Sequence, residues 1–154
     1  MLLSKACIYG VRASLYMSLV YSEGSFVSIK EMAGKLNISF HFLTKILQQI
    51  THAGIMHSYK GPNGGIALSK HPEKITIMEV VQAVDGNGLF EECLLGLPGC
   101  GAKKPCPMHE KWGDAREKIK FMFENTTLRE MSNKSIDFDL RLSDEFQVRD
   151  LVNH

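Results

Sequence analysis

The sequence predicts a mainly α-helical fold with a small β-hairpin wing, arranged as a winged helix-turn-helix module followed by a long dimerisation helix. Three observations predict it. Capping residues precede stretches whose apolar residues lie three and four positions apart, as in amphipathic helices. A glycine-rich turn separates two short strand-like runs directly after the third such stretch. A further helical pattern, with the spacing of a coiled-coil seam, begins at residue 112.

Length and composition are those of one ordinary globular protein. The chain has 154 residues, of which 44% are hydrophobic and 23% charged, and a globule of this length buries roughly 70% of its unfolded surface. No apolar run approaches the ~20 residues that span a bilayer, and residues 1–10 lack the pattern of an export signal. We therefore expect a cytoplasmic protein with no membrane partner.

The charges are distributed unevenly along the chain. The formal net charge is only +1, but residues 1–70 carry seven Lys or Arg against two Asp or Glu, and residues 71–154 carry eleven against fifteen. A basic first half beside an acidic second half predicts an anionic partner, such as DNA, for the first half only.

Residues 28–54 have the pattern of a helix-turn-helix. Ser28-Ile-Lys-Glu31 is a capping-box pattern at the start of the second helix. Asn37 suits the left-handed conformation that a tight turn requires, and Ser39 can cap a third helix that Gly54 ends. Two short helices joined by such a turn predict a DNA-binding motif.

A β-hairpin follows, and we interpret it as the wing. Residues 55–59 and 66–69 are strand-like, and Asn63-Gly64 is expected to form the turn between them. Thr76-Ile-Met-Glu79 is a second capping box, opening a helix that Gly86 ends. Residues 1–85 are therefore the predicted winged helix-turn-helix module.

The third helix and the wing supply the candidate DNA contacts. Recognition helices read base edges with their first turns, and cations on a narrow wing suit the minor groove. The alternatives are an ordinary solvated helix face and a plain surface hairpin. The candidates in the helix are Ser39, Phe40, His41, Thr44, Lys45 and Gln48, and those in the wing are Tyr59, Lys60, Gly61, Pro62, Asn63 and Gly64.

Residues 86–111 are a glycine- and proline-rich loop, which is long for a loop without secondary structure, so we expect a bound group or other contacts to order it. Cys93, Cys100 and Cys106 are separated by six and five residues, and His109 lies three residues beyond the last. Thiolates bind iron-sulfur clusters and zinc, and imidazole can replace one thiolate of a cluster. Zinc sites usually pair cysteines two to four residues apart, unlike these. Bare thiols acting as a redox switch also remain open, and so does a helix-capping role for His109.

The fourth cysteine, Cys7, lies in the first predicted helix, which Ser4 caps and which extends to Tyr21. Cys7 lies off the apolar stripe of that helix, so we expect it to face a dimer partner or solvent rather than the core. It is then a candidate fourth ligand donated by the partner subunit. The alternative is a small apolar residue at a packed contact. The stripe consists of Ala6, Tyr9, Ala13, Tyr16, Met17 and Val20.

The remaining residues divide into a helix and a tail. Residues 112–131 are the predicted dimerisation helix, within which Thr127-Leu-Arg-Glu130 can start another turn. Residues 132–154 are polar, and we expect them to be loosely held.

Together these stretches resemble one family, the bacterial winged helix-turn-helix iron-sulfur-sensing transcription regulators of the IscR and NsrR type. The resemblance covers residues 1 to about 131. It is carried by Leu3-Ser-Lys5 with Tyr9, Ser28-Ile-Lys-Glu-Met-Ala33, Leu43-Thr-Lys-Ile-Leu-Gln-Gln49, Gly61-Pro-Asn-Gly-Gly65, Ile75-Thr-Ile-Met-Glu-Val-Val-Gln-Ala-Val84, and Cys106-Pro-Met-His109 with Trp112.

The resemblance implies a homodimeric regulator, expected to be a repressor, that binds double-stranded operator DNA under the control of its cluster. It implies that Cys93, Cys100 and Cys106 are ligands. It favours His109 as the fourth, which goes with a 2Fe-2S rather than a 4Fe-4S cluster, and leaves Cys7 as an unusual substitute. Other members use an acidic residue near the start of the first helix, where this chain has Ile8 beside Cys7. Lys5, Tyr9, Ser28 and Lys30 lie in the matching stretches and complete the expected DNA-binding set.

Two alternative functions remain at this point. One is a DNA-binding regulator with a zinc or thiol redox switch and no cluster. The other is a thiol redox enzyme, which is poorly supported because the chain has no Cys-x-x-Cys, phosphate-binding glycine loop or nucleophile elbow. We therefore expect a protein that is not an enzyme.

Overall fold

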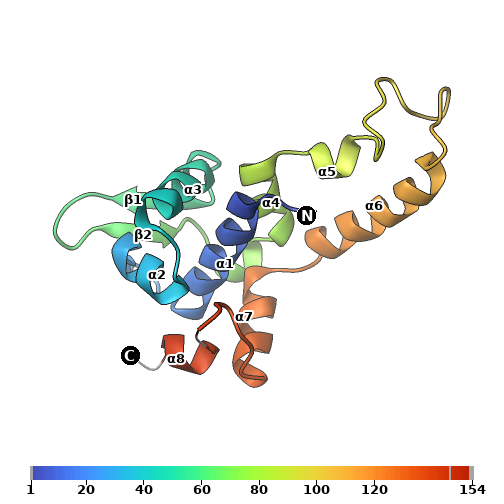
Figure 1. The fold of residues 1–154 in the computed structure, drawn as a ribbon. Coiled ribbons are helices and arrows are strands. Elements are labelled where there is room, and N and C mark those ends of the chain that lie inside the picture. Colours follow the sequence, from blue (N-terminus) through green and yellow to red (C-terminus); the bar gives the residue numbers. More distant parts are fainter. Residues whose placement is uncertain (1, 146, 153–154) are drawn as a thin grey trace.

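The computed structural model describes residues 2–145 and 147–152. The described residues form a helical body with one two-stranded antiparallel hairpin (Figure 1). In chain order the elements are α1 (Lys5–Leu19), α2 (Ile29–Leu36), α3 (Phe40–His52), β1 (Met56–Tyr59), β2 (Gly65–Leu68), the 3-10 turn η1 (Pro72–Lys74), α4 (Ile77–Asp85), α5 (Gly88–Glu91), α6 (His109–Glu124), α7 (Leu128–Asp137) and α8 (Val148–Val152). The predicted fold class is confirmed.

Local capping explains where the helix-turn-helix begins and ends. The Ser39 side chain accepts from the Phe42 N–H and caps α3, and Asn37 ends α2 in the left-handed region at φ 54°. Ser28 caps α2 by accepting from the Glu31 N–H at 3.4 Å. At the start of α4 the capping box is complete, because the Thr76 N–H also donates to Glu79 Oε2 at 2.8 Å. These side-chain bonds satisfy amides that the helices leave unpaired.

The wing forms as predicted, but its turn is centred one residue earlier. The Gly64 N–H donates to the Gly61 carbonyl at 3.0 Å, so Pro62 and Asn63 are the central residues rather than Asn63 and Gly64. Proline suits the first central position because its φ is fixed. The left-handed conformation falls on Gly61, at φ 119°.

Helix α1 is the centre of the core and contacts α2, α3, α4, α7 and β2. Because it is covered on several sides, its buried residues do not form one stripe. Cys7 is 0% exposed and belongs to the hydrophobic core. The expectation that Cys7 faces a partner subunit or solvent is therefore wrong. Gly10 permits the close packing, since a Cβ there would lie 3.2 Å from Val84 and 3.3 Å from Ile46.

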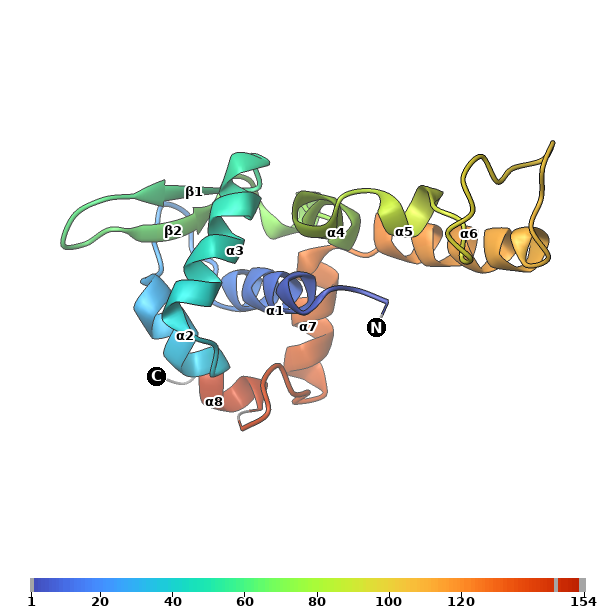
Figure 2. The same ribbon diagram turned by 45° about the horizontal axis from the view of Figure 1, so that its top comes forward.

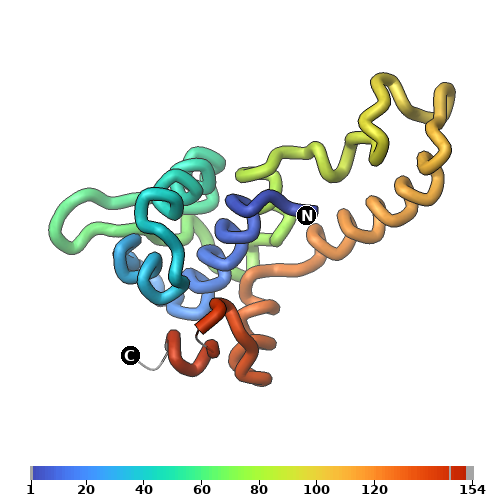
Figure 3. Tube along the Cα trace, in the orientation of Figure 1, coloured from blue at the N-terminus to red at the C-terminus, as the bar shows by residue number. Residues whose placement is uncertain are grey.

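The second half departs most from expectation. The helix predicted over residues 112–131 is two helices, α6 and α7, and Thr127 caps the second by accepting from the Glu130 N–H at 3.1 Å. The C-terminal segment is not loosely held, because Leu142, Val148 and Leu151 are buried in the core. Helix α6 extends away from the body, and the chain loops through residues 92–108 to reach its start (Figure 3). No helix among the described residues has the length and apolar character to cross a membrane.

Candidate nucleic-acid interface and cysteine site

The candidate recognition helix α3 separates its apolar and polar residues cleanly. Its apolar residues Leu43, Ile46, Leu47 and Ile50 are buried. The six predicted DNA contacts all lie off this buried stripe: Thr44 is partly buried, and Ser39, Phe40, His41, Lys45 and Gln48 are exposed. The Ser39 hydroxyl caps α3 and the Thr44 hydroxyl donates to the Phe40 carbonyl at 2.7 Å. The imidazole of His41, the ammonium of Lys45 and the amide of Gln48 are exposed to a ligand, as base-edge and phosphate recognition requires.

The hairpin extends beside α3, on the side away from α6 (Figure 2). A groove between the helix and the hairpin is lined by Thr44 and Gln48 of α3 and Ser58 of β1, among others. Tyr59 is 61% exposed, and its ring contacts the Phe26 ring at a tilted angle of 53°, with the centroids 4.3 Å apart. The remaining wing candidates, Lys60, Gly61, Pro62 and Asn63, are exposed, and Gly64 is half-buried.

The start of α1 adds a cationic cluster beside α3. The Tyr9 ring meets the Phe42 ring edge to face, at 5.6 Å between centroids. Lys5 Nζ and the Arg12 guanidinium lie 5.7 Å and 5.6 Å from the centre of the same Tyr9 ring. The structure thus brings Lys5 and Tyr9 to the recognition helix. Sequence reasoning missed Arg12, although it lies three residues after Tyr9 and so shares its helix face.

Ser28 and Lys30, the other two expected contacts, lie at the start of α2. The Ser28 side chain is engaged in capping, and Lys30 is exposed. Of the two, Lys30 is therefore the one whose charged group is available to a phosphate.

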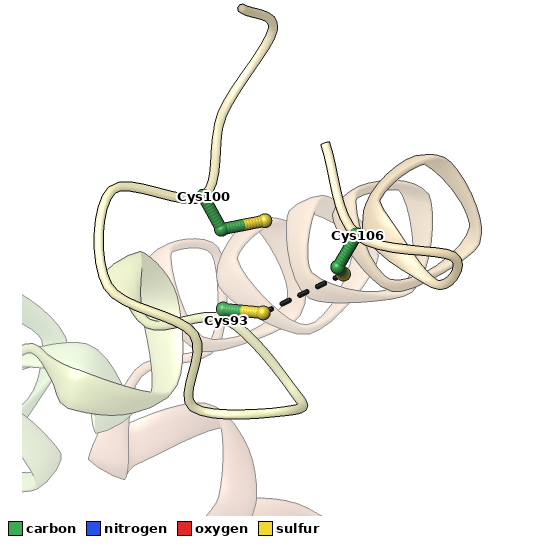
Figure 4. Close-up of side chains that lie close together, drawn as sticks. All are labelled: Cys93, Cys100 and Cys106. Carbon is green, nitrogen blue, oxygen red and sulfur yellow. Dashed lines mark hydrogen bonds between the residues drawn. The ribbon is translucent and has the colours of Figure 1, made fainter. Parts of the chain in front are cut away.

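The second site is built from the three loop cysteines, whose side chains point toward one another (Figure 4). Their Sγ atoms all lie within 4.8 Å of one another, and Cys93 Sγ lies 3.5 Å from Cys106 Sγ. His109 joins them, with Nδ1 at 3.5 Å from Cys100 Sγ. All three cysteines are partly buried.

Tight turns in the loop bring these side chains together. Gly96 and Gly99 adopt positive φ angles of 67° and 70°, which glycine adopts without strain. The Gly96 N–H donates to the Cys93 carbonyl at 2.9 Å, and the His109 N–H donates to the Cys106 carbonyl at 3.1 Å. The second bond closes the turn into α6, which places His109 beside the thiols.

The backbone favours a thiolate at one end of the group. The pKa of Cys93 is lowered to about 7, chiefly by the hydrogen bond from the Leu97 N–H. Burial opposes this shift, whereas the Leu95 N–H and the thiols of Cys106 and Cys100 add to it. The Cys106 N–H lowers the pKa of Cys100, but burial and the other two thiols outweigh it, so that pKa is raised. Thiols this close do not ionise independently.

The donor set fits a metal centre. Two thiolates bound to one tetrahedral metal at about 2.3 Å lie about 3.8 Å apart, close to the Cys93–Cys106 separation of 3.5 Å. Thiolate sulfur and imidazole nitrogen are the ligands of iron-sulfur clusters and zinc. Three sulfurs and one ring nitrogen complete a set of four.

Comparison with known proteins decides the family. Residues 3–134 match the family model Rrf2, described as "Iron-dependent Transcriptional regulator". The chain belongs to the Rrf2 family. It is a transcriptional regulator with a DNA-binding fold, as the family and its winged helix-turn-helix both indicate.

Individual relatives agree with the Rrf2 assignment. A protein assigned as an HTH-type transcriptional regulator in Aquifex aeolicus is 32% identical over 135 residues, covering 86% of this chain and 92% of that one. The HTH-type transcriptional regulator IscR of Pectobacterium carotovorum is 28% identical over 153 residues, covering 94% and 92%. The solved structure of CymR, the global cysteine regulator of B. subtilis, has the same fold, with TM-score 0.72, 24% identity and coverage of 86% and 96%. These Rrf2 relatives are regulators and not enzymes.

Cys7 does not fit the cysteine site of this Rrf2 chain. Burial, and secondarily the charge of Asp85 and a hydrogen bond with it, raise the pKa of Cys7 to about 12. A thiol that is fully buried and protonated is a poor ligand, because metals bind the thiolate. The burial corresponds to the alternative reading of Cys7, a small apolar residue at a packed contact.

Two residues that sequence reasoning did not assign to the site lie against the cysteine loop. Trp112 and Arg116 of α6 line the same cavity as the three cysteines and His109. From the sequence, Trp112 was expected as the first residue of a helix seam and as part of the stretch that resembles the family. Trp112 and Arg116 are four positions apart, so they share a helix face. This spacing was the sequence signal that could have placed both residues beside the loop.

Proposed function

We propose that this Rrf2 protein is a homodimeric repressor that binds double-stranded operator DNA and whose binding is controlled by an iron-sulfur cluster. The observation that carries the proposal is the group of three cysteine Sγ atoms within 4.8 Å, in a chain that also has an exposed polar recognition helix. The family description, which names iron, supports it. Its place of action would be the cytoplasm, where the DNA lies.

Cys93, Cys100 and Cys106 would hold the cluster, with His109 as the fourth ligand. The 3.5 Å separation of His109 Nδ1 from Cys100 Sγ supports the imidazole. An iron-sulfur cluster supplies one-electron redox chemistry, and histidine ligation on a 2Fe-2S cluster raises its potential. A histidine fourth ligand goes with a 2Fe-2S cluster in the regulators that this chain resembles, so we favour a 2Fe-2S over a 4Fe-4S cluster.

The DNA interface would combine the three exposed regions described above. The first turns of α3 would read base edges, the wing around Lys60 would enter the minor groove, and Lys5, Arg12 and Lys30 would meet phosphates. Because the contacts with phosphate are electrostatic, operator affinity should fall as salt concentration rises.

The experiment is selection of bound fragments from random double-stranded DNA, with anaerobically reconstituted protein and with metal-free protein. We expect one state alone to enrich a palindrome whose half-sites are about 34–36 Å apart, one helical turn. Cys106→Ala protein is the matched control and should behave as the metal-free form. The same enrichment in all three samples, or in none, would refute cluster control.

A thiol switch without metal is the second candidate. The Cys93 and Cys106 sulfurs are 3.5 Å apart, and the lowered pKa of Cys93 favours the nucleophilic thiolate. Metal-free protein would then change its DNA affinity on mild oxidation and recover it with a dithiol. Stoichiometric zinc in the isolated protein would instead identify a zinc site.

A further inference from the structure

The residue just before the first loop cysteine is held by two side chains of α6. Trp112 Nε1 and Arg116 Nη1 both donate to the Glu92 carbonyl oxygen, each at 3.1 Å. The two donors are one helical turn apart on the same face. Their shared acceptor fixes the start of the cysteine loop to α6, and with it the backbone of Cys93.

Arg116 also brings a positive charge to the cysteine site. It lines the cavity formed by Cys93, Cys100, Cys106 and His109. Within residues 2–145 and 147–152, no carboxylate pairs with its guanidinium. Its Nε is buried and has no hydrogen-bond partner there. A guanidinium keeps its charge at any physiological pH, so Arg116 brings a cation to a cavity that the three thiols and the exposed Glu91 also line.

We infer that Arg116 is a positioning and charge-compensating residue of the cysteine site. It holds Cys93 in place through the Glu92 carbonyl, and it offsets the negative charge of the thiolate-ligated group. The inference rests on the proposed cluster. One-electron reduction of the loaded protein by an added reductant increases the negative charge at the site. A nearby cation therefore favours the reduced state and raises the reduction potential.

The test is a reductive titration of anaerobically reconstituted, full-length protein with dithionite, followed by visible absorption. In Arg116→Gln the charge is lost, and we expect the reduction equilibrium constant to fall about tenfold, a shift of about 59 mV for one electron. Arg116→Lys keeps the charge and should restore the potential. Lys118→Gln is the matched control, because Lys118 is an exposed cation on the same helix and solvent screens it.

Trp112→Phe separates positioning from charge. It removes one donor to the Glu92 carbonyl and leaves Arg116 in place, so the potential should stay near that of the parent. The cluster should be lost to a chelator at least about twofold faster, because Cys93 is held by one bond fewer. Circular dichroism of each variant in the far ultraviolet confirms that it is folded.

The inference is overturned if Arg116→Gln and Lys118→Gln match the parent in both potential and rate of cluster loss. It is also overturned if Arg116→Lys shifts the potential as far as Arg116→Gln does, since charge would then be irrelevant. If Arg116→Gln does not retain a cluster, restoration by Arg116→Lys supports the inference and failure to restore overturns it. If the parent protein takes up no iron, the proposed function is overturned, and the inference with it. This outcome is seen in the parent alone, so it is distinguishable from failure of the inference.

Discussion

At the residue scale, Gly65 joins the wing to the segment before α2. The Val27 N–H donates to the Ile66 carbonyl and the Ile66 N–H to the Val27 carbonyl, both at 2.8 Å. A Cβ on Gly65 would lie 2.2 Å from the Val27 carbonyl oxygen, closer than any real contact. The hairpin can therefore pair with this segment only where residue 65 has no side chain.

We expect Gly65→Ala to lower the free energy of unfolding by about 1–3 kcal/mol, as overpacking does. Gly34→Ala is the matched control. A Cβ at Gly34, which lies within α2, meets no atom within 4 Å, so alanine should raise stability by up to about 1 kcal/mol. Urea unfolding of both variants measures the difference. Equal stabilities would contradict the close approach at Gly65.

The cysteines should differ sharply in reactivity. The pKa of Cys93 is lowered to about 7. Because the thiolate is the form that is alkylated, the alkylation rate of Cys93 in metal-free protein should rise as the pH increases through about 7. Cys7 is fully buried with a pKa of about 12, so it should stay unlabelled until the protein unfolds. Timed iodoacetamide labelling with peptide mass spectrometry measures both rates. Labelling of Cys7 as fast as Cys93 in folded protein would contradict its placement in the core.

Local residues were predictable, and contacts between distant residues were not. Ser4, Ser39 and Thr76 were recognisable as caps because a cap and its amide lie within three positions. The burial of Cys7 was not, because it depends on how many helices surround α1. The link from Arg116 to the Glu92 carbonyl spans 24 positions, and no sequence pattern encodes it.

At the element scale, the break between α6 and α7 shows the same limit. The Ile77 N–H donates to the Thr126 carbonyl at 3.0 Å, and the Leu128 N–H donates to the Ile75 carbonyl at 2.9 Å. The linker thus pairs with Ile75 and Ile77, at the start of α4, about 50 positions earlier. The helical pattern over residues 112–131 does not predict that pairing, although Thr127 indicated the start of a new helix.

The C-terminal helix α8 contributes to stability. Leu151 is 3% exposed, and it lines a cavity with Tyr16 of α1 and Lys35 of α2. We expect Leu151→Ala to lower the free energy of unfolding by about 2 kcal/mol. Ile136→Ala, at a residue that is 50% exposed, should change it by less than about 0.5 kcal/mol. Equal effects in thermal or urea unfolding would mean that α8 does not pack as described.

At the scale of the whole molecule, the wing and the cysteine loop lie at opposite ends (Figures 1 and 2). The proposed control of DNA binding by the cysteine site would therefore act through the helices between them. Helix α6 packs on α4, which packs on both α1 and α3. Displacement of α6 by a change in the loop would be transmitted along this route to the recognition helix.

We expect the proposed homodimer to form along α6. Phe121 and Met122 are 68% and 53% exposed, and Met122 lines an apolar groove with Val11 and Met131, among others. Met122→Glu would place a carboxylate in this contact, and we expect the dimer dissociation constant to rise at least about tenfold. Lys74→Glu changes charge at an exposed residue outside the groove and should leave it unchanged. Analytical ultracentrifugation measures both, and a fully dimeric Met122→Glu protein would contradict this interface.

Cluster binding at the three cysteines is tested most directly by the iron and sulfide content of anaerobically isolated protein, with its visible absorption spectrum. A protein that holds a 2Fe-2S cluster would be coloured and contain iron and acid-labile sulfide in equal amounts. The cluster should be lost in Cys106→Ala and retained in Cys7→Ser. Colourless parent protein without iron would rule out the proposed cluster, and loss of the cluster in a folded Cys7→Ser protein would rule out the assigned ligands.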